Sequence, residues 1–222
     1  SISATVCSFL HDIMALYPLC KRVFDFTAAL LALTLFGPLL IVIAVIIRLT
    51  SKGPAIFKQE RAGLRARPFV FFKFRTMRTD ADPFGPSPKS DNDPRLTGIG
   101  RFLREYSLDE LPQLVNILTG QMSLVGPRPL YVSQIPEWND RQKKRLDVKP
   151  GLTGLAQISG RGELTREEKL DLDVRYVESA SFRLDCKIML ATVGQVFLRK
   201  HIYEKQYSQN EHTRGQDSRR GK

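Results

Sequence analysis

The chain has 222 residues and a formal net charge of +11, and hydrophobic residues make up 42% of it. This length suits one domain with or without an anchor and leaves little room for two full domains. The hydrophobic content excludes global disorder, while the positive charge predicts an anionic partner, such as nucleic acid, a membrane surface or a phosphorylated substrate.

The first predicted element is an uncharged stretch of 22 residues from Phe26 to Ile47, FTAALLALTLFGPLLIVIAVII. As one helix it would be about 33 Å long at about 1.5 Å per residue, close to the thickness of a bilayer core. Its length and uniform hydropathy favour membrane insertion over a buried helix of a soluble domain or a cleaved signal peptide.

Two features of this stretch favour a re-entrant path over a spanning one, although both remain open. Pro38 lies in its middle, where the missing backbone donor and a clash with the preceding turn predict a kink. Basic residues flank both ends, including Lys21 and Arg22 before the stretch and Arg48 after it. Two cytoplasmic ends would satisfy the positive-inside rule. Asp25, in the first arm, needs a partner, and Arg22 or Arg48 could serve.

The chain that follows has a mixed pattern, which predicts an α/β (α+β) domain that is mostly helical and has a short sheet. Residues 67–78, RPFVFFKFRTMR, are typical of a strand. Because side chains alternate in a strand, Lys73 and Arg75 share the face opposite Phe72 and Phe74. This face is either a solvated basic surface or part of a site.

The remaining elements follow from periodicity and composition. Residues 84–98 are a loop by their Pro, Gly, Ser and Asp content. The spacing of Leu111, Leu114 and Leu118 predicts a helix that ends at Gly120. Residues 164–178 and 185–199 also show helical periodicity. The predicted organisation is an N-terminal segment (1–20), a membrane helix (21–51), a globular domain (52–202) and a basic, disordered tail (203–222).

An acidic pair, Asp109 and Glu110, lies between two arginines and has two interpretations. Ser107 and Glu110 form an S-x-x-E pattern that caps a helix. Alternatively the helix begins nearer Asp109, where Pro112 needs no donor, and Asp109 then stands beside unpaired N–H groups. That position suits phosphate binding and an ionised, nucleophilic carboxylate.

Cations in the surrounding sequence favour the chemical interpretation. They are Lys73, Arg75, Arg104, Arg128 and Arg161, of which Arg128 is fixed between two prolines. Several cations that converge on two carboxylates would mostly cancel unless another anion joins them. A diphosphate bridged by Mg²⁺ to the carboxylates would do so, because Mg²⁺ is typically held by one or two carboxylates and substrate phosphates.

Six stretches, in order, resemble the bacterial sugar transferases, the monotopic phosphoglycosyl transferases. They are KRVFDFTAALLALTLFGPLL, KQERAGL, FKFRTM, DPRLTGIGRFLREYSLDELPQLVNILTGQMSLVGPRP, KPGLTGLAQISGR and LDLDVRYV, and they cover most of residues 21–190. This resemblance implies transfer of a sugar 1-phosphate from a nucleotide sugar, usually a UDP-sugar, to undecaprenyl phosphate. It also implies a domain on the cytoplasmic face of the bacterial inner membrane.

The resemblance also implies roles for single residues. Asp109 matches the nucleophile that forms an aspartyl-phosphosugar intermediate, and Glu110 matches its metal-binding partner, with Asp109 also touching Mg²⁺. The basic positions of the site are matched by Lys73, Arg104, Arg128 and Arg161, and we expect Arg75, Arg128 and Arg161 to bind substrate. Pro38 matches the proline that breaks the family's re-entrant helix.

Two other functions remain as alternatives. One is a metal-dependent nucleotide-sugar pyrophosphohydrolase that uses the same pocket with water as the acceptor. The other is a membrane-tethered anion-binding module, although a single tryptophan argues against base stacking and hence against nucleic acid as partner. The expected partners are therefore the UDP-sugar, undecaprenyl phosphate and membrane lipid, and self-association with a second copy of the chain remains open.

Overall fold

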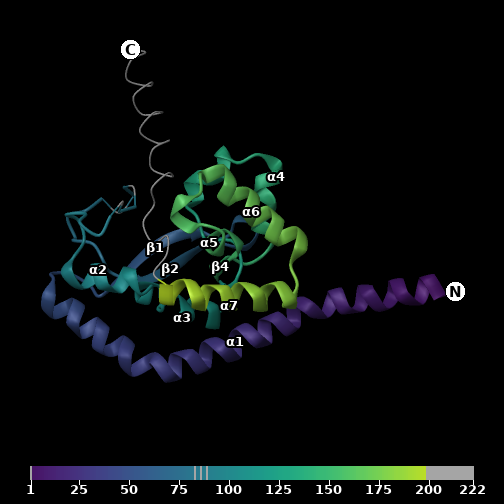
Figure 1. The fold of residues 1–222 in the computed structure, drawn as a ribbon, viewed down its shortest axis with the longest axis horizontal. Helices are drawn as coiled ribbons and strands as arrows, with labels where there is room; N and C mark the ends of the chain where they lie inside the picture. Colours follow the sequence, from purple (N-terminus) through teal and green to yellow (C-terminus); the bar gives the residue numbers. More distant parts are fainter. Residues whose placement is uncertain (1, 83, 86, 89, 199–222) are drawn as a thin grey trace, which may run out of the picture.

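The structure, a computed structural model, describes residues 2–82, 84–85, 87–88 and 90–198. The domain is mostly helical with two small sheets, as predicted, and a long N-terminal helix extends beyond it (Figure 1). The helices are α1 (Ile2–Thr50), α2 (Gly98–Glu105), α3 (Gln113–Leu118), α4 (Asp140–Lys143), α5 (Leu155–Ile158), α6 (Arg166–Ser179) and α7 (Phe182–Leu198). The strands are β1 (Ile56–Ala62), β2 (Pro68–Phe74), β3 (Ser123–Val125) and β4 (Gly151–Thr153). Short 3₁₀ turns are η1 (Leu64–Ala66), η2 (Leu108–Glu110), η3 (Val132–Glu137), η4 (Lys144–Asp147) and η5 (Arg161–Glu163). The predicted tail, 203–222, lies outside the described residues.

Helix α1 is one continuous helix of 49 residues that contains both Pro18 and Pro38. It therefore joins the expected N-terminal segment directly to the membrane helix. The helical assignment runs through Pro38 without interruption, and the ribbon in Figure 1 is bent rather than broken. Proline in a helix interior removes one hydrogen bond, for which a bend is the usual consequence.

Large apolar side chains cover the side of α1 that faces away from the domain. Leu31, Leu35 and Ile41 are 65%, 73% and 67% exposed. The segment Leu16–Thr50 is long and apolar enough to cross a membrane, and most of its most apolar window is not buried by protein. Exposure of this extent is costly in water, at about 25 cal/mol per Å² of apolar surface, so these residues indicate contact with lipid.

The opposite side of α1 packs on the domain along much of its length. Ala29 lies in a core cluster with Phe69 of β2 and Ile117 of α3. Ile43 and Ile47 lie in a second cluster. Each side chain of this kind that is fully buried contributes about 1.5–3 kcal/mol, so α1 belongs to the core as well as to the membrane.

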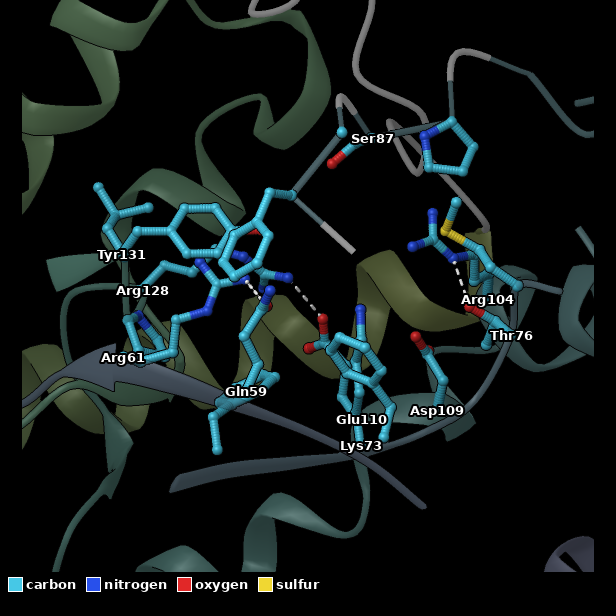
Figure 2. A pocket seen from close by; sticks show the side chains of 18 of the residues that line it. Gln59, Arg61, Lys73, Thr76, Ser87, Arg104, Asp109, Glu110, Arg128 and Tyr131 are labelled. Carbon is cyan, nitrogen blue, oxygen red and sulfur yellow. Dashed lines mark hydrogen bonds and ion pairs between the residues drawn. The ribbon is translucent and has the colours of Figure 1, made fainter. Parts of the chain in front are cut away.

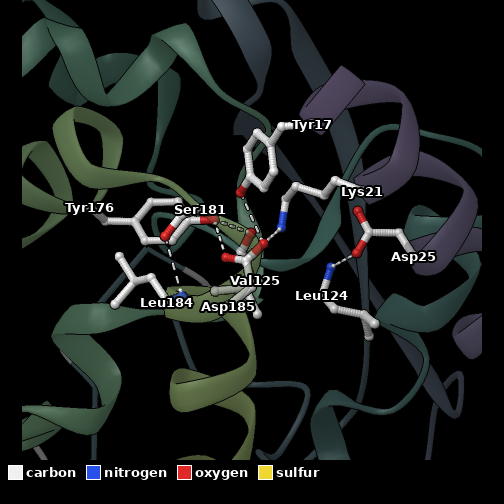
Figure 3. A network of polar contacts seen from close by, with 9 residues as sticks. All are labelled: Tyr17, Lys21, Asp25, Leu124, Val125, Tyr176, Ser181, Leu184 and Asp185. Carbon is white, nitrogen blue, oxygen red and sulfur yellow. Dashed lines mark hydrogen bonds and ion pairs between the residues drawn. The ribbon is translucent and has the colours of Figure 1, made fainter. Parts of the chain in front are cut away.

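Polar contacts fix the first part of α1 to the domain (Figure 3). The buried carboxylate of Asp185, on α7, accepts hydrogen bonds from the Tyr17 hydroxyl at 2.9 Å, the Lys21 Nζ at 2.6 Å and the Tyr176 hydroxyl at 2.7 Å. Asp25 is also buried, and it accepts the backbone N–H of Leu124 at 3.1 Å. The expected arginine partner of Asp25 is thus replaced by a backbone donor of β3.

Strands β1 and β2 form an antiparallel hairpin in which Phe57 is opposite Lys73 and Arg61 is opposite Phe69. The sequence predicts β2 within residues 67–78, and the structure confirms it. It does not predict β1, because its sequence, IFKQERA, carries charges that dilute the apolar signal. The hairpin brings alternate residues of two strands onto one surface, and that surface becomes the floor of the site.

Strands β3 and β4 form a short parallel pair. A Cβ on Gly151 would lie 2.1 Å from the backbone nitrogen of Gly126, so the close approach of the two segments requires glycine. This pair fixes the segment from Gly126 to Arg128, the GPR of the GPRP motif.

Candidate active site

A cavity of about 490 Å³ lies over the β1–β2 hairpin and is lined by residues from β1, β2, η2, α5, α6 and the intervening loops (Figure 2). Among the residues predicted for the site, it brings together Lys73, Arg75, Arg104, Asp109, Glu110 and Arg128. These residues come from four separate parts of the sequence. The predicted juxtaposition of two carboxylates with several cations is therefore present in the folded chain.

The floor of the cavity is formed by alternate side chains of the hairpin. Phe57, Gln59 and Arg61 of β1 and Phe71 and Lys73 of β2 all line it. The pairing of Phe57 with Lys73 places them on the same face, and the Lys73 Nζ lies 5.3 Å from the centre of the Phe57 ring. The alternation predicted for Lys73 thus points it into a site rather than into bulk solvent.

The acidic pair lies in η2, a single 3₁₀ turn between α2 and α3, and not in the first turn of a longer helix. Ser107 has a φ of 56° and makes no capping hydrogen bond, so the capping-box interpretation is wrong. Pro112 immediately precedes α3. The sharp turn presents Asp109, which is only 6% exposed, and Glu110 to the same cavity.

Three cations surround this pair. The Arg128 Nη2 donates to the Glu110 Oε1 at 2.8 Å. The Arg104 Nε donates to the Thr76 Oγ1 at 3.0 Å, which holds its guanidinium at the cavity wall. In Figure 2 the amine of Lys73 points toward the region between the Glu110 and Asp109 carboxylates. The arrangement offers both a carboxylate and positive charge to an incoming phosphate.

Burial, reinforced by the positive charge of Arg104, lowers the pKa of Lys73 from its usual 10.5 to about 8. The nearby carboxylates, Asp109 first, oppose this shift but do not cancel it. An amine with this pKa changes its charge close to neutral pH. The ammonium form attracts phosphate and the neutral amine does not, so the charge of this site depends on pH.

We therefore expect kcat/KM for the reaction at this site to fall as the pH rises through about 8, because Lys73 then loses its proton in the free protein. Because the pKa of Lys73 is lowered to about 8, its attraction for phosphate is complete at pH values well below 8 and is lost at pH values above it. The measurement is a pH profile of the wild type beside Lys73→Arg, which keeps its charge and should lack this descending limb. An identical limb in the variant would assign the titration to another group.

A buried ion pair that the sequence does not predict contacts the backbone of Arg128. The Arg145 Nη2 lies 2.7 Å from the Asp173 Oδ2 and also donates to the backbone carbonyl of Arg128 at 2.6 Å. Arg145 and Asp173 are each 3% exposed, and burial raises the pKa of Asp173 against the opposing effect of Arg145. The only sequence signal for this pair is that Asp173 lies in the quoted stretch LDLDVRYV.

Two of the predicted substrate-binding arginines differ from this group. Arg75 lines the cavity, but its guanidinium donates to the backbone carbonyls of Ser51 and Lys52 and to the Ser51 hydroxyl, so it holds the chain at the end of α1. Arg161 begins η5, and its side chain lies outside the described part of the chain.

The far end of the cavity contains further residues that the sequence did not single out. The Arg61 guanidinium lies 3.6 Å from the centre of the Tyr131 ring, and its Nη2 donates to the Gln59 Oε1 at 2.6 Å. These side chains form a polar, aromatic wall, in which Arg61 lies four residues along β1 from Phe57.

The donor set fits Mg²⁺ only together with a phosphorylated ligand. Among the described residues, no group of three or more Asp, Glu, His or Cys side chains is placed to hold a metal ion. Asp109 and Glu110 offer two neighbouring carboxylates on one cavity. This matches the usual coordination of Mg²⁺ by one or two carboxylates, water and substrate phosphates.

Comparison with known proteins gives a consistent set of similarities. A family model described as bacterial sugar transferase matches residues 16–199. The uncharacterized sugar transferase EpsL of Bacillus subtilis (strain 168) is 44% identical over 184 residues, which are 83% of this chain and 90% of that protein. The galactosyl transferase CpsE of Streptococcus agalactiae serotype III (strain NEM316) is 45% identical over 190 residues, which are 80% of this chain and 42% of that protein. The UDP-glucose:undecaprenyl-phosphate glucose-1-phosphate transferase of Escherichia coli (strain K12) is 42% identical over 193 residues, which are 83% of this chain and 42% of that protein. The chain therefore spans most of the Bacillus protein but less than half of the other two.

Proposed function

Because this chain belongs to the bacterial sugar transferase family, we propose that it is the catalytic unit that transfers a sugar 1-phosphate from a UDP-sugar to undecaprenyl phosphate. The observation that carries the proposal is the buried Asp109, which shares a cavity with Glu110, Lys73, Arg104 and Arg128 near the end of α1, a helix whose outer side is apolar and exposed. Relatives such as the Escherichia coli protein are named as UDP-glucose transferases, so UDP-glucose is the first donor to test.

The proposed reaction has two phosphoryl-transfer steps. In the first, a carboxylate oxygen of Asp109 bonds to the β-phosphorus of the donor, and the bond from that phosphorus to the bridging oxygen breaks, so UMP leaves with the electron pair. In the second, a phosphate oxygen of undecaprenyl phosphate attacks the same phosphorus and the carboxylate of Asp109 is released. No net proton or electron is required in either step.

The cations act on the charge that builds up during both steps. Lys73 and Arg104 lie at the cavity wall beside Asp109, and Arg128 reaches Glu110 from the other side. Preorganised positive groups of this kind stabilise the equatorial oxygens of a transferring phosphoryl group. Asp109 and Glu110 would hold Mg²⁺ together with the donor, and the metal would supply further positive charge to the phosphate oxygens.

The experiment that tests this function is UMP release from a panel of UDP-sugars, with and without undecaprenyl phosphate in detergent. We expect release sustained by the acceptor, loss of release with a chelator and recovery with Mg²⁺. Sustained release without acceptor would identify a pyrophosphohydrolase. Salt-sensitive binding of anions with no UMP release from any donor would identify a binding module.

We also propose that α1 enters and leaves the cytoplasmic leaflet of the inner membrane on the same side, which keeps the catalytic domain in the cytoplasm. Lys21 and Arg48 flank the apolar stretch, and Lys21 and Arg22 both contact the domain, as the residues after Thr50 do. In sealed inverted vesicles, Cys20 and the introduced thiol of Lys52→Cys, each as the single cysteine of its protein, should both react with an impermeant maleimide. Protection of only one of the two would indicate a spanning helix.

A further inference from the structure

The cavity differs in chemistry from one end to the other. Near the end of α1 it is lined by the apolar residues Pro54, Ile56, Phe57 and Met77. At the other end of β1 it is lined by Gln59, Arg61 and Gln134, together with Leu130 and Tyr131. Four residues of strand separate Phe57 from Arg61, which corresponds to about 13 Å. One continuous cavity therefore presents an apolar wall at one end and a mixed polar and aromatic wall at the other.

The apolar wall lies beside the end of α1. Ile56 packs against the buried cluster that contains Ile43 and Ile47, on the side of α1 that faces the domain. Pro54 follows the last residue of α1, Thr50, by only four positions. Leu49, in the last turn of that helix, is 81% exposed. An apolar chain that lies along this end of α1 would thus meet the apolar wall of the cavity.

Positive charge lies directly beside this wall. Lys73 is the cross-strand partner of Phe57, with its Nζ 5.3 Å from the ring centre. Arg104 lines the same cavity, as does Asp109. A ligand whose phosphate rests near Lys73 would place the carbons that follow the phosphate against Phe57.

We infer that the wall formed by Pro54, Ile56, Phe57 and Met77 binds the first isoprene units of a prenyl phosphate acceptor, while the nucleotide of the donor occupies the Arg61 end. This inference rests on the proposed function and adds to it the direction from which each substrate reaches Asp109. The nucleotide of the donor has a planar base, a ribose and a diphosphate, and these groups match the Tyr131 ring, Gln59 and the Arg61 guanidinium at the other end of the cavity. An acceptor with an anionic head and a hydrocarbon tail matches the neighbouring cations and the apolar wall together.

The test uses the full-length protein with two substitutions at one position. Phe57→Gln keeps a side chain of moderate size but makes the wall polar, whereas Phe57→Leu keeps it apolar. Val70→Gln is the matched control, because Val70 is a 44% exposed apolar residue of β2 that does not line the cavity. Each protein is assayed for KM toward undecaprenyl phosphate and for the donor half-reaction, measured as exchange of labelled UMP into the UDP-sugar without acceptor.

We expect Phe57→Gln to raise KM for undecaprenyl phosphate about tenfold, Phe57→Leu to raise it no more than about threefold, and Val70→Gln to leave it unchanged. Val70→Gln should also keep the rate of the exchange reaction, and in Phe57→Gln the rise in KM should be larger than any change in the exchange rate. An unchanged KM in Phe57→Gln would overturn the inference. A lower rate of UMP exchange in Phe57→Gln, with an unchanged KM for undecaprenyl phosphate, would mean that the wall binds the donor instead. Absence of exchange in the wild type would count against the covalent route of the proposed function and not against the wall.

Discussion

Replacing Asp109 with asparagine is expected to abolish sugar-phosphate transfer, with a loss of at least about a thousandfold in kcat. Asparagine has nearly the same shape as aspartate, so the η2 turn and the packing around this buried side chain should survive. It lacks the anionic oxygen that would bond to phosphorus. The measurement is UMP release, accompanied by mass spectrometry of protein incubated with donor alone. The wild type should gain the mass of a phosphosugar on Asp109, and the variant should not.

The control for this substitution is Asp82→Asn. Asp82 lines the same cavity but is exposed at its rim, so its loss should change the rate by no more than a few fold. Thermal unfolding of both variants separates a chemical defect from a folding defect. Full turnover in Asp109→Asn, with a melting temperature like that of the wild type, would rule out a covalent aspartyl intermediate.

The second large effect is expected on stability, from Arg145→Met. This substitution removes one partner of a buried ion pair and leaves the buried carboxylate of Asp173 without it, which typically costs about 3–5 kcal/mol. For a protein of this size we expect the melting temperature to fall by roughly 10 °C. Arg145 also donates to the carbonyl of Arg128, so transfer should decrease as well.

The chain offers a matched control for this prediction. Arg141 and Asp171 form a second pair between the same two parts of the chain at 2.8 Å, but their side chains are 55% and 47% exposed. Arg141→Met should therefore cost no more than about 1 kcal/mol. The double variant Arg145→Met with Asp173→Leu should recover much of the stability but not the activity, since Arg128 still lacks its support. Equal stability of the two single variants would contradict the assigned burial of the Arg145 pair.

The elements that the sequence predicts well are those with a strong local pattern. The apolar stretch, the strand at 67–78 and the helices near 164–178 and 185–199 all appear as α1, β2, α6 and α7. Each of these depends on a periodicity carried by neighbouring residues, which packing reinforces.

The sequence does not predict correctly the elements whose stability depends on partners far away in the chain. Strand β3 has three residues and exists because it pairs with β4, whose partner residues lie 28 positions away. Ser107 looks like a helix cap, but the domain holds it at a φ of 56° and turns the acidic pair into the cavity. A local capping pattern cannot reveal this constraint, because it comes from packing around η2 rather than from the residues themselves.

For the candidate site, residue chemistry and family resemblance identified the carboxylates and most of the surrounding cations. They could not show which cation contacts which group. Arg128 meets Glu110 across 18 positions and Arg145 meets Asp173 across 28, so both pairs depend on the folded chain. Arg75 has the residue type and strand position of a substrate ligand, yet its guanidinium binds the backbone after α1.

The contacts that Tyr17, Lys21, Arg22 and Asp25 make with the domain leave no hinge between anchor and enzyme. In the proposed membrane arrangement, the anchor and the domain should therefore move within the leaflet as one rigid body, which would hold Asp109 at a constant height relative to the lipid headgroups. A water-soluble donor then arrives by diffusion in three dimensions, while the hydrophobic acceptor needs to search only two.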